Sequence, residues 1–580
     1  MSQEIVRILK NIFGADTRIE VSVPDGELFG HYSTNFALRQ AKLKGIPPLE
    51  LAKEYAARIA AAAPARFFQK VEAAAPGFIN FWLSDATMQK EFAAIARDKK
   101  YGAGTIGKGK TVIVEYSQPN IAKKMHVGHL RTTIIGAALA NILELSGYRV
   151  VRWNYLGDWG TQFGKLIAAY KLWGNKKSVE KDPIEELQKL YVRFHAEMKS
   201  DPELEKRGQE EFKKLEEGDR ENRKLWEWFK KESLKEFMKM YKTLDVDFDV
   251  WIGEAFFERE MKATVKELVD KNIAERSEGA VVAKLDAAGL PPALIQKSDG
   301  ASLYLTRDIA NLRYRLKKYK PAKILYVVGN EQALAFEQLF AIAALLGWNS
   351  AELKHIKYGL VLGAGGKKLS TREGTAQLLE GVIGEAVAKA SEVIEVKNPD
   401  LTLAEKMEIA FTGAMGALKY NDLKENRTTD IIFNWEKMLD FSGDSAPYLQ
   451  YTYARLKSIL RKSQAVGAAE SQNAKSKSVE PALKTGDAAT LVRTIELALM
   501  RKLFEFPDIV ERAGELYSTS TLATYLYKLA VATNKFYETT PILKDDDVAR
   551  RSARLVLAAS AARILQKGLG LLGIKTLEKI

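Results

Sequence analysis

The sequence has 580 residues, 46% of them hydrophobic and 28% charged, which suits about three or four domains of ordinary globular composition. It contains no cysteine, which excludes a disulfide scaffold, a thiolate zinc site and a cysteine nucleophile. The net charge of +14 is typical of proteins that bind a polyanion, although solubility accounts for it equally well. We find no apolar run near about 18 residues and no signal-peptide core, so we expect a cytoplasmic protein outside the membrane.

Residues 1–108 have the pattern of a small α/β domain. A helical repeat of apolar residues covers the stretch IPPLELAKEYAARIAAAA. Two short strand-like runs follow, at Phe67–Val71 and Gly77–Leu83, and the second comes directly after an APG turn signal. The glycine-rich segment Tyr101–Lys110 then closes the domain.

The central segment, 109–395, alternates strands and helices in the way that builds a parallel sheet. A buried-strand pattern at TVIVEYS is followed by a loop with the tetrapeptide HVGH, a helix over Leu130–Leu145 and a strand at YRVVRWNYLG. This order of strand, helix and strand implies a right-handed crossover between parallel strands. Two more strands, AKILYVVG and HIKYGLVLG, are predicted on either side of a helix over Ala333–Leu346. We therefore predict a Rossmann-like α/β domain.

Two insertions interrupt this domain, and a helical region follows it. A highly charged stretch at about 176–244 is predicted to be a solvated helical insertion, and the alternation at Ala274–Leu290 predicts a hairpin. From 396 to 580 the periodicity is helical, with capping residues. Within that region Ser463–Gly486 is rich in alanine, serine and lysine, which predicts a disordered loop between helices.

The tetrapeptide His126–His129 stands directly after the first strand of the predicted sheet. In an open parallel sheet this position borders the crevice where ligands bind, and the start of the next helix favours a phosphate. Gly128 allows a ligand close to the backbone, and the two histidines share one face of the first turn, where they can donate to phosphate oxygens. A His-x-x-His pair can also be a metal site or a helix cap. With five histidines and no cysteine, a zinc site is the least favoured alternative.

A second candidate motif, GGKKLSTREGT at Gly365–Thr375, lies about 240 residues further along the chain. Its cations Lys368 and Arg372 and its hydroxyl Ser370 suit the stabilisation of charge on a leaving pyrophosphate. On its own, such a loop is more often a solvated turn. The two motifs at the ends of one Rossmann-like sheet are far more specific than either motif alone.

The HVGH tetrapeptide resembles the HIGH signature of class I aminoacyl-tRNA synthetases, and KLSTR resembles their KMSKS loop. The surroundings are similar to arginyl-tRNA synthetases over nearly the whole chain, in VEYSQPNIAKKMHVGHLRTTIIG, NYLGDWGTQFGKLI, LYLTRDIANLRYR and LKYNDLKENRTTDIIFNWEKMLDFSGDSAPYLQYTYARLKSI. The resemblance implies a Rossmann-like catalytic domain, a small N-terminal α/β domain that touches the tRNA elbow, and an all-α anticodon-binding bundle. It also implies an arginine–tRNA ligase that uses Mg-ATP, L-arginine and tRNA(Arg), without a tightly bound cofactor or a protein metal site, and that acts as a monomer.

The resemblance further assigns roles to single residues. Glu115 and Asp308 match an acidic pair that binds the guanidinium of arginine, because a planar cation pairs best with fixed carboxylates. Taken alone, Asp308 beside Arg307 reads as an ordinary surface ion pair. The other arginine-binding positions are Gln118, Pro119, Asn120, His129, Tyr304 and Gln332. The ATP-binding positions are His126, Gly128, His129 and Lys368, and the catalytic positions are Lys123, His126, His129, Lys368, Ser370 and Arg372.

Lys123 is expected to compensate for a departure from the common signature. Thr371 stands where the KMSKS loop has its second lysine, arginyl enzymes often lack that lysine, and the resemblance implies that a lysine just upstream of HVGH supplies its charge. Lys123 occupies that position. Of the other departures, Glu373 places an anion near the expected path of pyrophosphate. The remaining ones, which remove no residue assigned to chemistry, are Leu369 for methionine, Ala335 for histidine and Gln118 for serine.

Aromatic and basic residues interleave on the first long helix predicted in the C-terminal part. Such a mixture suits the stacking of splayed RNA bases and contact with phosphates, although a tyrosine stripe is more often part of a core. The resemblance assigns this stripe to tRNA binding, and it assigns Phe78 and Asn80 to a contact with the tRNA elbow. The residues of the stripe are Tyr448, Tyr451, Tyr453, Arg455 and Lys457.

Three alternatives remain beside an arginyl enzyme. Another class I synthetase is disfavoured by the acidic pair, and a cysteinyl one also by the absence of cysteine ligands for zinc. An RNA-binding relative without catalysis is disfavoured by the intact motif histidines. A nucleotidyltransferase for a small metabolite could share HxGH but has no use for the long helical C-terminal part.

Overall fold

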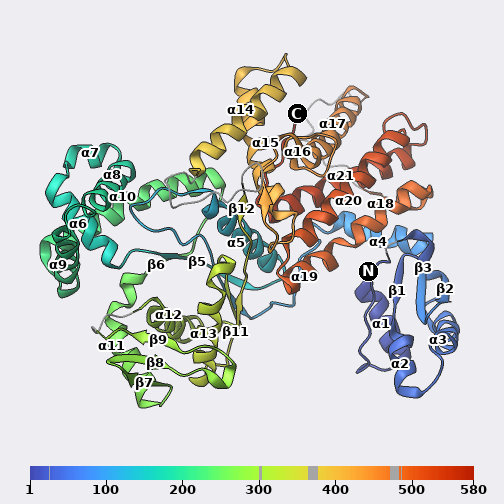
Figure 1. The fold of residues 1–580 in the computed structure, drawn as a ribbon. Helices are drawn as coiled ribbons and strands as arrows, with labels where there is room; N and C mark the ends of the chain where they lie inside the picture. The colour runs from blue at the N-terminus through green and yellow to red at the C-terminus, as the bar shows by residue number, and fades with distance from the viewer. Residues whose placement is uncertain (25, 299–302, 363–376, 471–482, 485, 580) are drawn as a thin grey trace.

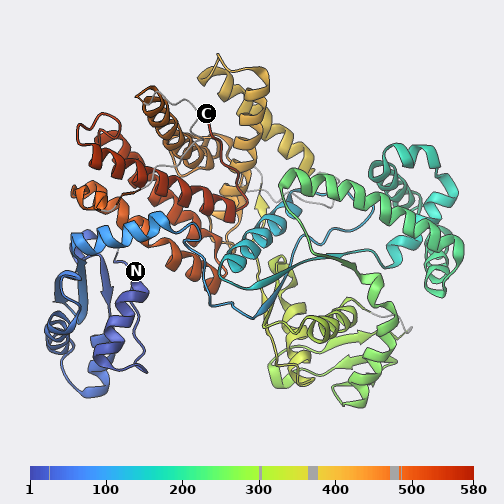
Figure 2. The same ribbon diagram turned by 180° about the vertical axis from the view of Figure 1, so that it is seen from behind.

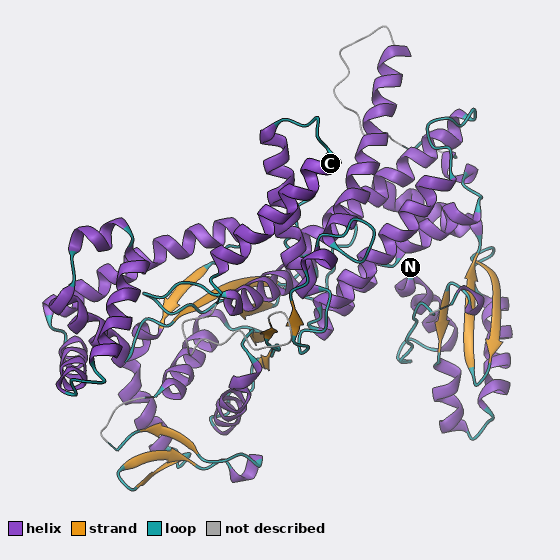
Figure 3. Ribbon diagram, turned by 45° about the horizontal axis from the view of Figure 1, so that its top comes forward, coloured by secondary structure: helices purple, strands orange, loops and turns teal. Residues whose placement is uncertain are grey.

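The computed structural model describes residues 1–580 except 25, 299–302, 363–376, 471–482, 485 and 580. The molecule is mostly helical, and its strands lie in separate groups (Figure 3). The N-terminal sheet and the helical insertion lie at opposite ends, with the central sheet and the C-terminal helices between them (Figures 1 and 2). Within the described residues, no helix combines the length and the apolar character needed to cross a membrane.

A three-stranded antiparallel sheet, in the order β1-β3-β2, organises the N-terminal part. β2 (Phe68–Ala74) and β3 (Phe78–Leu83) confirm the two predicted strands. β1 (Tyr32–Thr34) escaped the sequence analysis, because three consecutive buried residues are too few to show an alternating pattern. The helical elements of this part are α1 (Ser2–Phe13), η1 (Glu27–Phe29), α2 (Phe36–Lys44), α3 (Pro48–Ala62) and α4 (Asp85–Arg97).

The central sheet confirms the predicted Rossmann-like arrangement. Its five strands pair in parallel in the order β11-β10-β4-β5-β6. The chain moves outward from β4 through β5 to β6, and later adds β10 and β11 on the other side of β4. The winding therefore reverses between β4 and β10, and ligands bind beyond the carboxyl ends of strands at such a point. The strands are β4 (Thr111–Glu115), β5 (Arg149–Leu156), β6 (Val250–Gly253), β10 (Lys323–Tyr326) and β11 (Glu352–His355).

The strand predicted at HIKYGLVLG is wrong in position. β11 ends at His355, and the apolar residues further on form β12 (Val361–Leu362), which pairs with β13 (Ile431–Ile432) outside the central sheet. The backbone N–H of Leu360 donates to Asp430 Oδ1 at 2.7 Å, which fixes this pairing. The partner lies 70 residues away in the chain, so local periodicity gives no sign of it.

Helices fill the insertion, as predicted, and a small antiparallel sheet follows it. α6 packs against α9, so the helical body begins before the charged stretch. The predicted hairpin is formed by β7 and β8, and β9 adds a third strand to it. The helices of the body are α6 (Thr161–Trp173), α7 (Lys176–Lys181), α8 (Pro183–Glu197), α9 (Glu203–Glu217) and α10 (Arg220–Leu244). The elements that follow, up to β11, are η2 (Glu254–Glu260), α11 (Met261–Asp270), β7 (Ala274–Ser277), β8 (Ala280–Ala283), η3 (Asp286–Ala288), β9 (Ala293–Gln296), α12 (Tyr304–Tyr319), η4 (Asn330–Gln332) and α13 (Ala333–Leu345).

The C-terminal part is helical, as predicted. Its first helix, α14, ends at Lys397, so the boundary expected between 395 and 396 falls in the last turn of that helix. The loop predicted at Ser463–Gly486 is wrong for its first part, because α17 continues to Glu470, whereas 471–482 and 485 lie outside the described residues. The helices are α14 (Leu379–Lys397), α15 (Leu403–Leu423), α16 (Trp435–Met438), α17 (Ala446–Glu470), η5 (Asp487–Thr490), α18 (Thr494–Phe504), α19 (Phe506–Leu516), α20 (Thr519–Thr539) and α21 (Val548–Leu571).

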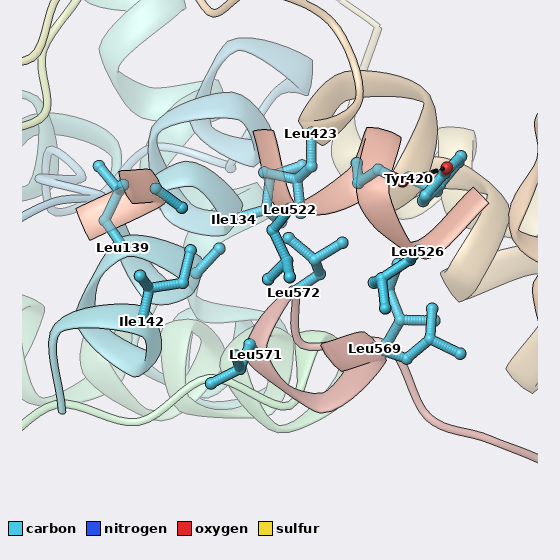
Figure 4. Close-up of a cluster of buried hydrophobic side chains, with 14 of the residues drawn as sticks. Ile134, Leu139, Ile142, Tyr420, Leu423, Leu522, Leu526, Leu569, Leu571 and Leu572 are labelled. Carbon is cyan, nitrogen blue, oxygen red and sulfur yellow. Dashed lines mark hydrogen bonds between the residues drawn. The ribbon is translucent and has the colours of Figure 1, made fainter. Parts of the chain in front are cut away.

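The helix that follows HVGH, α5 (Val127–Leu145), is anchored in the C-terminal helices. Figure 4 shows its apolar side chains facing leucines from α15, α20 and α21, and each buried aliphatic side chain contributes roughly 1.5–3 kcal/mol. Arg131 of α5 is fully buried and lies 3.1 Å from Asp422 of α15. Its guanidinium also donates to the carbonyl oxygens of Leu360 and Arg427. The motif therefore starts from a helix that is held on several sides.

Candidate active site

The loop between β4 and α5 adopts a backbone that L-residues seldom take. Three of its non-glycine residues have positive φ, namely Ser117 (77°), Gln118 (50°) and Ala122 (61°). Such residues cost roughly 1–3 kcal/mol each and persist where the surroundings hold them. The N–H of Ser117 donates to Thr132 Oγ1 at 3.1 Å, and that of Ala122 donates to Ser233 Oγ at 2.9 Å. A loop that is both strained and held in this way is typical of a functional site.

A cavity of about 1350 Å³ opens at this loop, at the switch point of the sheet. It is bounded by the loop itself, by the first turns of α5, and by the segments 328–332 and 357–361, which follow β10 and β11. Thr428 and Asp430 close it from the C-terminal side. The cavity is large enough for a nucleotide together with a second small substrate.

The two motif histidines cap the helix that they begin. His126 Nδ1 accepts from the N–H of Gly128, and the N–H of His126 donates to His129 Nδ1, each at 3.1 Å. The capping alternative is thus confirmed, and it fixes the tautomer. With Nδ1 accepting on both rings, each neutral imidazole carries its proton on Nε2, which is then a hydrogen-bond donor.

Both histidines are neutral at pH 7. Burial and the neighbouring charge of Lys123 lower the pKa of His126. Burial lowers the pKa of His129 to about 3, with further contributions from His126 and Lys123. Gly128 is needed for this geometry, because a Cβ there would lie 2.9 Å from His126 Cε1. The histidines therefore offer donors to an anion without changing charge themselves.

An ionic cluster lies behind the loop, at the end of β4. Glu115 is 3% exposed and forms an ion pair with Arg315 of α12, whose side chain is fully buried. Gln118 Nε2 donates to Glu115 Oε1 at 2.6 Å, which links the cluster to the wall of the cavity. Burial and the charge of Glu115 raise the pKa of Asp308 to about 7, while Arg315 and Arg307 oppose the rise. The predicted acidic pair is brought together, but Glu115 already has a cationic partner.

Besides Arg315, the sequence analysis missed one more residue of this cluster, Glu254. Glu254 follows β6 at the carboxyl edge of the sheet, and its Oε2 lies 3.7 Å from Arg307 Nη1. Burial raises the pKa of Glu254 to about 8, Arg307 opposes the rise, and Asp308 and Asp158 add to it. Arg307 also lies over the ring of Tyr304, 5.5 Å from its centroid, at the exposed start of α12. The alternative interpretation of Asp308, a surface ion pair with Arg307, does not hold, because Arg307 pairs with Glu254 in a network that reaches β6.

The other predicted substrate residues stand on opposite walls of the cavity. Asn120 is exposed and pairs through its backbone with Gly157, where a Cβ would lie 2.0 Å from Asn120 Oδ1. Gln332 is exposed in the turn after β10. Pro119 is buried and shapes the loop. Gln118, Asn120 and Gln332 therefore face one space.

The second motif lies outside the described residues, together with Lys368, Ser370, Thr371, Arg372 and the departures Leu369 and Glu373. The residues that follow it are described, and they contact the first motif. The N–H of Val127 donates to Gln377 O at 3.2 Å, and the N–H of Leu379 donates to Met125 O at 3.0 Å. Before the second motif, Val361 borders the cavity. After the motif, Gln377 contacts the histidine turn.

The predicted tRNA-binding stripe on α17 is only partly at the surface. Tyr453 is 1% exposed, and its hydroxyl donates to Glu578 Oε1 at 2.7 Å, so this side chain faces the C-terminal segment. The guanidinium of Arg455 lies 4.8 Å from the ring centroid of Tyr451 and 4.9 Å from that of Tyr537. The partly exposed residues of the stripe are Tyr448, Tyr451, Arg455 and Lys457.

In the N-terminal sheet, only one of the two predicted RNA contacts is exposed. Phe78, the first residue of β3, is 37% exposed. Asn80 is 4% exposed, and Ser33 Oγ of the neighbouring strand donates to its Oδ1 at 2.7 Å. Asn80 therefore serves the pairing of β1 with β3 in this structure, and its side chain is not presented to a partner.

A parallel sheet, a nucleotide-sized cavity at its switch point and a pair of neutral histidine donors are the fold and site of a class I aminoacyl-tRNA synthetase. Three family models match the chain: tRNA synthetases class I (R), catalytic domain, over residues 92–435; DALR anticodon binding domain over 449–580; and arginyl tRNA synthetase N terminal domain over 1–83. The chain belongs to the arginyl-tRNA synthetase family.

Individual relatives agree with the family models. The arginine–tRNA ligase of Fusobacterium nucleatum is 42% identical over 563 residues, which cover 97% of this chain and 95% of that protein. The arginine–tRNA ligase of Clostridium perfringens is 44% identical over 516 residues, 88% of either chain. The solved arginyl-tRNA synthetase of Thermus thermophilus is 26% identical and matches with a TM-score of 0.82, covering 100% of this chain and 99% of that one.

Proposed function

We propose that this protein joins L-arginine to tRNA(Arg) in two steps. The carboxylate of arginine attacks the α-phosphorus of Mg-ATP, which forms arginyl-adenylate and releases pyrophosphate. A terminal ribose hydroxyl of the tRNA then attacks the arginyl carbonyl and releases AMP. The observation that carries the proposal is that one cavity is lined by both histidine donors and by Gln118, whose amide donates to Glu115 of the buried acidic cluster.

The protein supplies position and charge, because neither step needs a protein nucleophile. The Nε2–H groups of His126 and His129 point donors at phosphate oxygens, and their low pKa values keep them neutral as charge develops. Lys123, next to this turn, neutralises charge on the leaving pyrophosphate. From the second motif Lys368, Ser370 and Arg372 act on the same group, and Mg²⁺ enters with ATP as part of the substrate.

The acidic cluster selects arginine. Asp308 and Glu115 pair with the guanidinium, Tyr304 packs on it, and Gln118, Asn120, Pro119 and Gln332 orient the rest of the amino acid. An uncharged amino acid of similar length leaves the buried carboxylate of Asp308 without a guanidinium, whereas Glu115 keeps its ion pair with Arg315. An unpaired buried polar group costs far more free energy than a lost apolar contact. Selection against such an amino acid therefore needs no editing step.

The tRNA is bound at two places far from the cavity. At the anticodon loop, bases stack on Tyr448 and Tyr451, and phosphates are neutralised by Arg455 and Lys457. At the elbow, the tRNA packs on Phe78. Tyr453 and Asn80 support these surfaces from beneath, as their hydrogen bonds to Glu578 and Ser33 suggest. We also propose that arginine activation needs the bound tRNA, whereas a monomeric state and a cytoplasmic location stay predictions of the sequence.

Arginine-dependent exchange of labelled pyrophosphate into ATP tests the activation step. We expect exchange with arginine, ATP and tRNA(Arg) present, and a strong decrease when the tRNA is left out. Lysine or glutamine in place of arginine serves as the control and should give no exchange. Absence of exchange both with and without tRNA would overturn the proposed function, whereas full exchange without tRNA would overturn only the tRNA requirement.

A further inference from the structure

The helical insertion holds the segment that leads into HVGH. On α10, Ser233 Oγ accepts from the N–H of Ala122, a residue with φ of 61°. On α8, Glu185 forms an ion pair with Lys124. The ammonium of Lys123 lies 5.4 Å from the ring centroid of Tyr191, also on α8. Two helices of the insertion, α8 and α10, thus contact the chain directly before the catalytic turn.

The two neighbouring lysines are held in different ways. Lys124 is paired with a carboxylate, so its charge is compensated. Lys123 has no carboxylate within ion-pair distance among the residues that the structure describes. Its contact is an aromatic face, which attracts a cation through the ring quadrupole without cancelling its charge. An ammonium held this way keeps its full charge for a phosphate.

The surroundings of Tyr191 keep its ring neutral and fixed. The ring of His195, one turn along α8, packs against it in an edge-type contact with a centroid distance of 4.5 Å. Burial lowers the pKa of His195, with contributions from Lys165 and Lys123, so this neighbour is uncharged at pH 7. Burial and the nearby Tyr304 raise the pKa of Tyr191, so the phenol stays protonated. The ring face that contacts Lys123 is therefore uncharged at pH 7.

We propose that Tyr191 is a positioning residue, supplied by the insertion, that holds the ammonium of Lys123 beside the leaving pyrophosphate and leaves its charge uncompensated. This inference rests on the proposed function, in which Lys123 acts on pyrophosphate. The insertion then has a part in catalysis, because it fixes the one lysine that replaces the second lysine of the common signature. Lys123 is exposed, so its ammonium can reach a ligand, and partial burial lowers its pKa.

A double-mutant cycle tests the proposal. Tyr191→Leu and Tyr191→Phe are made in the wild-type chain and in Lys123→Met, and pyrophosphate exchange is measured with tRNA(Arg) present. We expect Tyr191→Phe to keep kcat within about twofold of wild type, because the aromatic face remains. Tyr191→Leu should lower kcat by between about threefold and thirtyfold, with the KM for arginine unchanged. In Lys123→Met, Tyr191→Leu should cause no further loss.

The control is a contact of the same kind in the same insertion. Arg193 of α8 lies 4.4 Å from the ring centroid of Trp173, at the end of α6. Trp173→Leu removes that contact without touching Lys123, and it should leave exchange unchanged. Thermal unfolding of each variant checks the fold. Where Tyr191→Leu does not fold, Tyr191→Met, which fills similar volume without a ring, replaces it in the cycle.

The possible failures are distinguishable. No exchange by the wild-type chain contradicts the proposed function, and a Lys123→Met variant with wild-type exchange contradicts the role given to Lys123. The present inference fails when Lys123→Met impairs exchange but Tyr191→Leu costs the same factor in both backgrounds. It also fails when Tyr191→Phe is as harmful as Tyr191→Leu, or when Trp173→Leu lowers kcat by the same factor.

Discussion

The capture of arginine should depend on pH through Asp308. Burial raises the pKa of this carboxyl group from 3.8 to about 7, the charge of Glu115 adds to the rise, and Arg315 and Arg307 oppose it. Only the ionised carboxylate pairs with a guanidinium. Protonation of Asp308 therefore competes with arginine binding within the physiological pH range.

The size of the effect follows from the pKa. With a value of about 7, about half of the carboxyl groups are ionised at pH 7 and about one tenth at pH 6. The kcat/KM for arginine, which reports ionisation in the free enzyme, should rise about tenfold from pH 6 to pH 8. Stability changes in the opposite direction. Between about pH 4 and 7 the folded chain binds more protons here than the unfolded chain, so the free energy of unfolding falls as pH rises.

The assay is pyrophosphate exchange with tRNA(Arg), at saturating ATP and varied arginine, from pH 6 to pH 8. Asp308→Asn is the matched control, because it keeps the shape and cannot ionise; its kcat/KM should be low and nearly independent of pH. Glu254→Gln tests the neighbouring group, whose pKa of about 8 adds a weaker dependence above pH 7. A flat wild-type profile, or the same slope in Asp308→Asn, would refute the reasoning.

Three further predictions concern the cluster and the histidine turn. Arg315→Met leaves Glu115 buried without its partner, which should lower the free energy of unfolding by about 3–5 kcal/mol. A second substitution in the same chain, Glu115→Met, should restore most of this stability. Urea unfolding measures both; an unchanged midpoint in the single variant contradicts the ion pair. His126→Asn keeps an acceptor for the helix cap but removes the Nε2–H donor, so exchange should fall about 100-fold with little change in Tm. A lower Tm with normal exchange would assign His126 to structure alone. Gly128→Ala places a Cβ against the His126 ring and should raise the KM for ATP more than the KM for arginine. Equal increases in both KM values would contradict the assignment of the histidine turn to ATP.

Much of the site could be predicted because its signals are local. The strand before HVGH, the helix after it and the next strand show their periodicity within about 45 residues, so the β–α–β unit and its crevice follow from the sequence. The capping role of the two histidines could be stated only as an alternative. It depends on the extended backbone of His126 at the N-cap, which a tetrapeptide does not reveal.

The partners that arrive from elsewhere in the chain could not be predicted. Arg315 lies about two helical turns after Asp308, which places both on one face of α12, and that spacing was the one signal available. Glu254 and Tyr191 gave no signal, because nothing near them in sequence indicates which surface they meet. The pairing of β12 could not be predicted for the same reason, since its partner strand, β13, lies in the C-terminal part. Local patterns specify elements, and the contacts between distant elements complete the site.

Aminoacylation of total tRNA with a panel of labelled amino acids tests the central claim most directly. The account predicts that arginine alone becomes attached to tRNA, that the product is arginyl-tRNA(Arg), and that the reaction depends on ATP. Attachment of another amino acid in preference to arginine would contradict the assignment of the acidic cluster. Binding of tRNA(Arg) without attachment of any amino acid would contradict the catalytic role of the histidine turn.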